Sequence, residues 1–144
     1  IGVRRGGSEM CIEPAGRPLL NAEALADWAK GEGFHNLVPE AWHVTIARSE
    51  AGTILALDDR PLVIRARGRR RVSRFGGLIV LEFASRALTA RNRQWSVSDA
   101  ELKFRRFRPH VSFTPDDGRD LSCVFPFRGE LVLGPETFDQ GAPF

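Results

Sequence analysis

Tyrosine is absent from the sequence, which also holds one methionine and only two lysines, so arginine carries almost all of the positive charge. Two cysteines, Cys11 and Cys123, are too few for a disulfide framework and do not form the Cys-x-x-Cys pair of a zinc ribbon. No apolar run approaches the roughly 20 residues that cross a bilayer as a helix. These absences exclude a disulfide-rich secreted scaffold and a helical membrane protein, and we expect a soluble protein of the reducing cytoplasm.

Hydrophobic residues make up 42% of the chain and charged residues 27%, which is the balance of an ordinary globular domain. A chain of 144 residues can bury one sizeable core, so we expect residues 1–144 to form a single domain. The chain begins with Ile1 rather than with methionine, and we expect part of the natural N-terminus to precede it.

The net charge is +3, and the basic residues gather in two clusters, 65–74 and 103–108. Guanidinium groups match the geometry of phosphate, so both clusters favour an anionic substrate. A solvated hairpin surface explains such a cluster equally well.

Helical periodicity predicts one helix over 22–30, with Asn21 as its N-cap, and a second from Arg86 to about Trp95, with Ser85 as its cap. Strand patterns occupy 42–48, 61–67, 77–83, 107–114 and 125–133, and an arginine-rich turn separates the second from the third. The order of these elements suggests two related halves that share one core. We therefore predict an α+β fold with an antiparallel or mixed sheet.

Two of the three histidines have a hydroxyl residue two positions later, in His43-Val44-Thr45 and in His110-Val111-Ser112. Ser and Thr make up 13 of the 144 residues, so this pairing arises by chance in about 2% of such sequences. Successive side chains of a strand point to opposite faces, so each motif would place a histidine and a hydroxyl on one side and apolar neighbours in the core. Two such strands side by side would surround a single anion with two imidazoles and two hydroxyls.

This set of side chains suits the cleavage of a phosphodiester. One neutral histidine can accept the proton of the attacking hydroxyl while the other, protonated, donates one to the leaving oxygen. The hydroxyls can donate hydrogen bonds to the nonbridging phosphoryl oxygens. Such chemistry needs no metal and no other cofactor.

The paired motifs resemble those of the 2H phosphoesterase superfamily, and the wider sequence resembles its phage anti-CBASS cyclic-oligonucleotide phosphodiesterases. The segments that carry this resemblance are 17–23, 29–34, 38–46, 78–83, 107–113 and 129–136, which together span most of the chain. The resemblance implies a bilobal fold with two pseudo-symmetric β-sheet lobes, outer helices and a central cleft where the motifs face each other. It also implies cleavage of the 3′-5′ bonds of cyclic di- and trinucleotide immune signals in the cytoplasm of a bacterial host.

By the same resemblance, His43 and His110 would be the acid and the base, and Thr45 and Ser112 would bind phosphate. Glu136 matches a position that contacts the nucleobase in such enzymes. The family tends to place an aromatic residue early in the chain for base stacking, whereas this sequence has Cys11, Ile12 and Glu13 there.

Further substrate contacts are open to two interpretations each. Phe75 or Trp42 could stack on a base, although core packing is the more common role of such residues. Arg48, which follows Thr45 in the same predicted strand, and Arg108, two residues before His110, could hold phosphate or lie exposed. We expect a cyclic oligonucleotide or another nucleotide as the partner, and neither a membrane nor a stable nucleic-acid complex. The sequence does not determine the oligomeric state.

Three other interpretations use the same residues. An RNA 2′,3′-cyclic phosphodiesterase shares all four motif residues, and a non-catalytic nucleotide-binding module would need only the basic and hydroxyl groups. His43, His110, Cys11 and Cys123 have the residue types of a zinc site but lack ligand-pair spacing. His35 has no hydroxyl partner and follows the first predicted helix, so we expect it on the surface.

Overall fold

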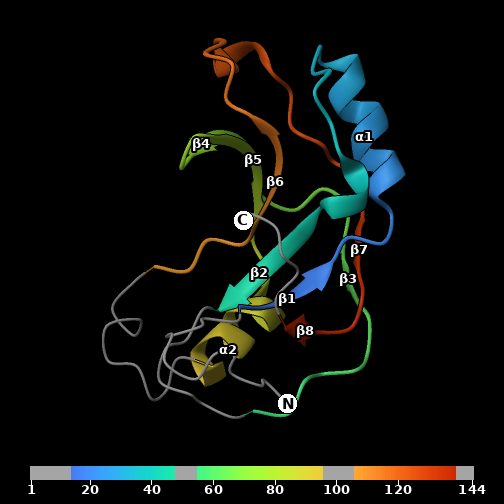
Figure 1. Cartoon of the computed structure of the whole chain (residues 1–144), viewed down its shortest axis with the longest axis vertical. Helices are drawn as coiled ribbons and strands as arrows, with labels where there is room; N and C mark the ends of the chain where they lie inside the picture. Colours follow the sequence, from blue (N-terminus) through green and yellow to red (C-terminus); the bar gives the residue numbers. More distant parts are fainter. Residues whose placement is uncertain (1–13, 48–54, 96–105, 139–144) are drawn as a thin grey trace, which may run out of the picture.

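The computed structural model describes residues 14–47, 55–95 and 106–138 of the chain (Figure 1). In this part the strands are β1 (Ala15–Pro18), β2 (His43–Ala47), β3 (Leu62–Ile64), β4 (Arg70–Phe75), β5 (Leu78–Phe83), β6 (His110–Pro115), β7 (Leu131–Leu133) and β8 (Thr137–Phe138). The helices are α1 (Ala22–Gly31) and α2 (Arg86–Trp95), and two short 3-10 turns, η1 (Pro39–Ala41) and η2 (Leu121–Cys123), lie in the loops. None of the described helices is long and apolar enough to cross a membrane.

Six strands form an antiparallel sheet in the order β4-β5-β6-β2-β1-β8, and β3 pairs with β7 in a separate two-stranded sheet. Strands β2 and β6, which carry the two motifs, are therefore neighbours at the centre of the larger sheet. Residues that are far apart in sequence meet here because β2 pairs directly with β6. Strands β5 and β1 flank this central pair on either side. The fold is α+β, as predicted, while the described elements form one continuous main sheet rather than two evident lobes.

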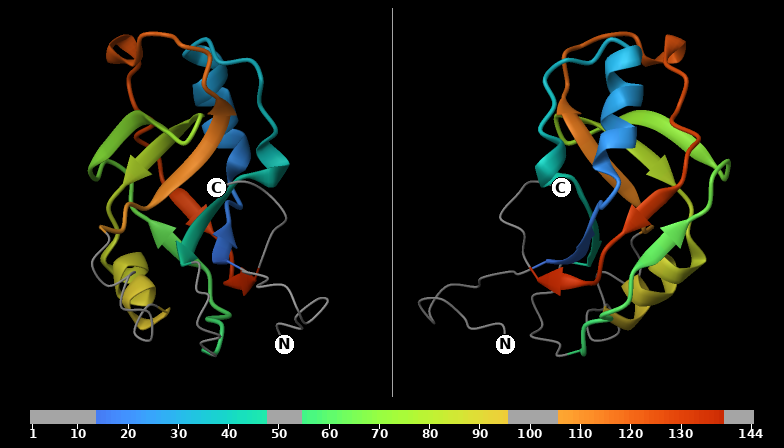
Figure 2. Two further views of the ribbon diagram at one scale, coloured as in Figure 1. Left: turned by 60° about the vertical axis from the view of Figure 1, so that its left-hand side comes forward. Right: turned by 90° about the vertical axis from the view of Figure 1, so that its right-hand side faces the viewer.

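The core lies on the side of the main sheet to which Val44 and Val111 point, and both of these side chains are fully buried. In the right-hand view of Figure 2, α1 and β7 lie in front of β2 and β6. Trp28 of α1 packs edge-on against Phe113 of β6, with ring centroids 5.2 Å apart. Leu88 and Trp95 of α2 and Leu131 and Leu133 of β7 complete the same buried cluster.

Both predicted helices are confirmed, and Ser85 caps α2 through a hydrogen bond from the Leu88 amide to its hydroxyl. Asn21 occupies the N-cap position of α1, as predicted, but its side chain does not cap the helix. Its side chain makes no capping bond and instead bonds to the backbone of Glu130 and Val132, which ties the start of α1 to β7.

The strand predictions around 61–67 and 125–133 are too long, because only 62–64 and 131–133 pair. The arginine-rich turn before Gly77 is the larger error, since residues 70–75 form strand β4 and pair with β5 along their whole length. As the first strand in the sheet order, β4 has a free side, where charged side chains such as Arg71 and Arg74 remain exposed.

Candidate active site

The pairing of Val44 with Val111 sets the geometry of the site. In this antiparallel register His43 is next to Ser112 and Thr45 is next to His110. Because Val44 and Val111 point into the core, these four polar side chains share the opposite face of the sheet. Cross-strand neighbours have Cβ atoms about 5 Å apart, which is close enough for the four groups to surround one phosphate.

Each motif histidine is held by a local hydrogen bond of the same kind. Nδ1 of His43 lies 2.9 Å from the carbonyl oxygen of Ala41, and Nδ1 of His110 lies 2.8 Å from that of Arg108. A carbonyl oxygen only accepts, so each Nδ1 carries a hydrogen. In the neutral ring, Nε2 is then the free base, and each ring is oriented by the backbone two residues before it.

Two polar atoms of the second motif, Nε2 of His110 and the hydroxyl oxygen of Ser112, are buried and have no hydrogen-bond partner among the described residues. A buried polar group that lacks a partner costs about 1–3 kcal/mol. Native structures rarely retain such groups without a functional reason. Unpaired buried atoms of the described residues also occur on Arg17, Arg70, Trp95 and Thr137. The two in the second motif lie together beside the first motif, where they could bond to the oxygens of a ligand.

Glu82 of β5 lies directly opposite His110 on the same face. Its carboxylate accepts two hydrogen bonds from Arg108, of 3.0 and 2.6 Å, and a third from the hydroxyl of Ser73. Burial acts to raise the pKa of Glu82, but these hydrogen bonds and the charges of Arg108 and Arg71 outweigh it, and the net pKa is lowered. Glu82 is therefore an anion at neutral pH.

The pKa of His110 is lowered, chiefly because burial disfavours the charged imidazolium. The bond to the Arg108 carbonyl and the negative charge of Glu82 act in the opposite direction, and the charges of Arg108 and His43 add to the lowering. His110 is thus poised to be neutral in the free site at pH 7.

Gly16 of β1 lies opposite Thr45 on the motif face. A Cβ atom on Gly16 would come within 2.6 Å of the carbonyl oxygen of Val44, which is closer than real Cβ atoms approach. The glycine thus lets β1 lie tight against β2, and it leaves the space beside Thr45 without a side chain.

Among the other predicted contacts, Phe75 and Arg108 lie near His110. The Phe75 ring meets the imidazole edge-on, with centroids 4.9 Å apart, and keeps 41% of its surface exposed. Arg108 and Phe75 line a small crevice with His110 and Glu82. Trp42 is buried against Phe113, so its alternative role in core packing is confirmed.

Glu136 is not brought to the motif face. Its side chain is fully buried, and it receives two 2.7 Å bonds from Arg91 and one from the Asp58 amide. Arg17 lies 3.9 Å away. Its assignment as a nucleobase contact stays a prediction, which these internal contacts do not support.

The remaining candidates lie outside this group or outside the described residues. Arg48 and Cys11 fall in ranges that the structure does not describe. His35 is exposed, as predicted, and Cys123 is exposed in η2. Within 14–47, 55–95 and 106–138, no three His, Cys, Asp or Glu residues cluster as metal ligands would.

Sequence reasoning missed Glu82, Ser73 and Gly16 as members of the site. Glu82 had a signal, since it is the only charged residue in the apolar stretch 77–83. Ser73 and Gly16 had none, because their importance depends on which strands pair.

Comparison with known proteins identifies the family of the chain that carries this site. The model of the anti-CBASS protein Acb1 family matches residues 16–140, which covers both motifs and nearly all of the described fold. The chain belongs to the Acb1 family. It is 37% identical over 151 aligned residues to the anti-CBASS protein Acb1 of Caulobacter sp. (strain RHG1), covering 96% of this chain and 24% of that protein. It is 36% identical over 137 residues to that of Sphingomonas paeninsulae, covering 86% of this chain and 22% of that protein. The chain thus spans about a quarter of the length of these two Acb1 relatives.

Proposed function

We propose that this Acb1-family chain is a phosphodiesterase of the 2H type that cleaves the 3′-5′ bonds of cyclic di- and trinucleotide immune signals, and so counters the CBASS defence. The observation that carries the proposal is the Val44–Val111 pairing, which gathers two histidines and two hydroxyls on one face. The two relatives are named anti-CBASS proteins, which supports the biological setting. The two-lobed arrangement of the superfamily belongs to the same proposal, and it is supported by the strand order β5-β6-β2-β1, which places one flanking strand on each side of the motif pair.

In the proposed reaction, Nε2 of one histidine takes the proton from the ribose 2′-hydroxyl next to a 3′-5′ linkage. That oxygen attacks phosphorus, and the bond from phosphorus to the 5′-oxygen breaks. The second histidine, protonated at Nε2, gives its proton to the departing oxygen. The products are a 2′,3′-cyclic phosphate and a free 5′-hydroxyl, and the step needs neither a metal nor another cofactor.

The hydroxyls of Thr45 and Ser112 stabilise the charge that develops on the nonbridging oxygens. Their placement beside the two histidines fits this role, because each hydroxyl lies across the strand pair from the histidine of the other motif. The Nδ1 bonds to the Ala41 and Arg108 carbonyls hold both rings with Nε2 free for proton transfer.

The test incubates the purified chain with EDTA and a panel of 3′,3′-cyclic di- and trinucleotides, a 2′-deoxy analogue, and linear RNA that ends in a 2′,3′-cyclic phosphate. Products are followed by chromatography. The single variants His43→Ala and His110→Ala are expected to lose activity by at least about 100-fold, the contribution of a general acid or base. His35→Ala is the matched control, since His35 is exposed and has no hydroxyl partner.

Cleavage of the cyclic substrates in EDTA that both variants lose, with the 2′-deoxy analogue left intact, is the expected result. Turnover of only the linear 2′,3′-cyclic ends would replace the proposal with RNA processing. Tight binding of cyclic nucleotides without products would replace it with a nucleotide-binding module. Circular dichroism of each variant separates a lost proton donor from a lost fold.

A further inference from the structure

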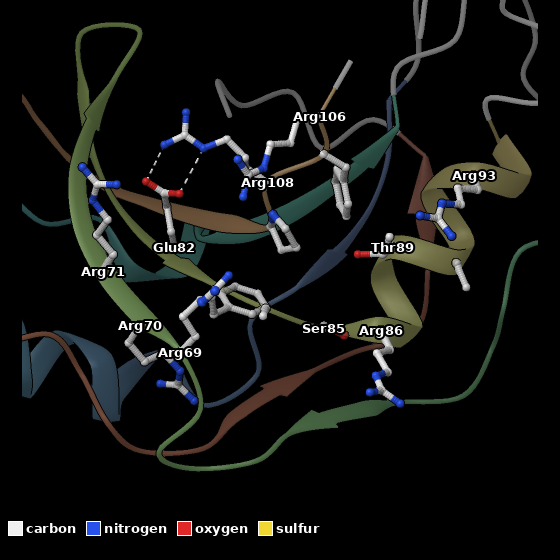
Figure 3. Close-up of a pocket in the computed structure, with 15 residues that line it drawn as sticks. Arg69, Arg70, Arg71, Glu82, Ser85, Arg86, Thr89, Arg93, Arg106 and Arg108 are labelled. Atoms are coloured by element: carbon white, nitrogen blue, oxygen red, sulfur yellow. Dashed lines mark hydrogen bonds and ion pairs between the residues drawn. The ribbon is translucent and has the colours of Figure 1, made fainter. Parts of the chain in front are cut away.

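A second hollow lies beside the motif site, at the end of the main sheet where β4 begins, β5 ends and β6 begins. Its volume is about 900 Å³, within the range of ligand pockets. Figure 3 shows arginines around this region on separate elements of the fold. Among the described residues, the charged lining consists of one carboxylate, Glu82, and seven arginines: Arg69, Arg70, Arg71, Arg86, Arg93, Arg106 and Arg108. We call this hollow the arginine cavity.

Glu82, the one carboxylate that the described residues contribute to the arginine cavity, is neutralised by Arg108, so this part of the lining remains strongly positive. Glu82 accepts both bonds of Arg108. Arg69, Arg86, Arg93 and Arg106 make no hydrogen bond or ion pair with the part of the chain that the structure describes. Several cations that share one hollow repel each other, and an anionic ligand would relieve that repulsion.

Helix α2 presents one face to the core and another to the arginine cavity. Leu88 and Trp95 are buried on the core side. Arg86, Thr89, Ala90 and Arg93 follow the i, i+3, i+4, i+7 spacing of one helical face, and all four line the cavity. The helix therefore directs two cations and a hydroxyl into the hollow.

Considered without a ligand, Arg86 destabilises the start of helix α2. It is the first residue of α2, whose first turn holds no acidic residue. A cation at a helix N-terminus opposes the helix dipole, whereas an anion there is favoured. This local cost is explained if the position serves a bound anion rather than the stability of the helix.

The arginine cavity adjoins the motif site through two shared residues. Glu82 and Arg108 line both the cavity and the small crevice beside His110. Neighbouring strands lie about 4.8 Å apart, so the cavity begins roughly one strand beyond the histidine. Its apolar wall, formed by Phe83, Phe107 and Pro109, offers a surface for a nucleoside between two phosphates.

From these relationships we propose that the arginine cavity is a second phosphate subsite, which holds an uncleaved phosphate of the substrate while the motif site cleaves another. This inference rests on the proposed function and goes beyond it. It requires that the substrate carry at least two phosphates, and it makes α2 a determinant of substrate choice. The subsite strengthens binding rather than chemistry, since Arg86 and Arg93 belong to α2 and not to the strands that carry the motifs.

The test compares a 3′,3′-cyclic dinucleotide, which has two phosphates, with a linear dinucleoside monophosphate, which has one. The double variant Arg86→Ala/Arg93→Ala removes both cations of α2. The control Lys30→Ala/Arg65→Ala removes the same charge from exposed positions outside the cavity. Both double variants retain all the motif residues, and their melting temperatures are checked first.

The Arg86→Ala/Arg93→Ala variant is expected to raise KM for the cyclic dinucleotide by about tenfold, or about 1.4 kcal/mol, while kcat stays within about twofold. KM for the dinucleoside monophosphate and both constants of the control should not change. An equal loss for both substrates, or an equal loss in the control, overturns the subsite.

Failure of the proposed function is recognised separately. Where a compound is not turned over, its dissociation constant on the His43→Ala chain, measured by calorimetry, takes the place of KM. If the Arg86→Ala/Arg93→Ala change then weakens binding of the cyclic dinucleotide but not of the dinucleoside monophosphate, the subsite proposal stands for a protein that does not cleave its ligand. No measurable binding of either compound would overturn both proposals.

Discussion

Glu82 lies directly opposite His110 in the pairing of β5 with β6. The equivalent position beside His43, on β1, is occupied by Pro18. Two histidines with the same kind of backbone hydrogen bond therefore have different electrostatic surroundings, because in the described sheet a carboxylate lies opposite only His110. The charge of Glu82 acts to raise the pKa of His110 and so partly offsets the burial that lowers it.

Replacing Glu82 with glutamine should lower the pKa of His110 further. The change removes the negative charge that acts to raise this pKa, and it leaves the positive charge of Arg108 uncompensated. Titration of the imidazole Cε1 proton by NMR measures the shift. Glu130→Gln is the matched control, because Glu130 is exposed on the surface. An unchanged or higher pKa in the Glu82→Gln chain would show that this carboxylate does not govern His110.

The lowered pKa of His110 also predicts how stability depends on pH. The unfolded chain, in which the imidazole has its usual pKa of 6.5, binds this proton more readily than the folded chain. Stability is then complete above pH 6.5 and falls as the pH drops from there toward the folded pKa of His110. Urea denaturation across this window should show the decline in the native chain and a smaller one in His110→Gln. The same slope in both would assign it to other groups.

Ser112→Ala should separate stability from activity. The Ser112 hydroxyl is buried without a partner, so its removal relieves an unsatisfied group, and the melting temperature should hold or rise. Activity on the cyclic substrate should fall by about 100-fold if the hydroxyl stabilises the transition state. Calorimetry and initial rates provide the two measurements. A clear loss of stability would mean that the hydroxyl has a structural partner in the free protein.

The paired motifs and both helices could be predicted because they depend on local periods. Spacing of two along a strand puts His43 with Thr45, and spacing near 3.6 defines α1 and α2. Strand β4 could not, since four of its residues are polar or charged and only the pairing with β5 reveals it. A different pairing, that of β5 with β6, puts Glu82 beside His110, 28 residues away along the chain (110 − 82), and no local sequence pattern indicates this contact.

Glu136→Gln tests whether this residue holds the fold together or contacts a base. Its carboxylate is buried and bonded to Arg91, so loss of the charge should cost about 3 kcal/mol of stability. Far below the melting temperature, KM for the cyclic dinucleotide should not change. A raised KM in a chain of unchanged stability would instead support the base contact implied by the resemblance.

Gly16→Ala should damage both the sheet and the site. A Cβ atom would lie 2.6 Å from the Val44 carbonyl oxygen, so β1 must move away from β2. Such overpacking costs about 1–3 kcal/mol. The movement also displaces Thr45, which lies opposite Gly16. Both kcat and the free energy of unfolding should therefore decrease.

The matched control for this change is Gly31→Ala at the end of α1, where a Cβ atom would meet nothing within 4 Å. Alanine is favoured over glycine in a helix, so this variant should match or exceed the stability of the native chain. Urea denaturation measures the stability of both variants, and initial rates measure their activity. If the two glycine variants behave alike, the tight contact of β1 with β2 does not set the position of Thr45.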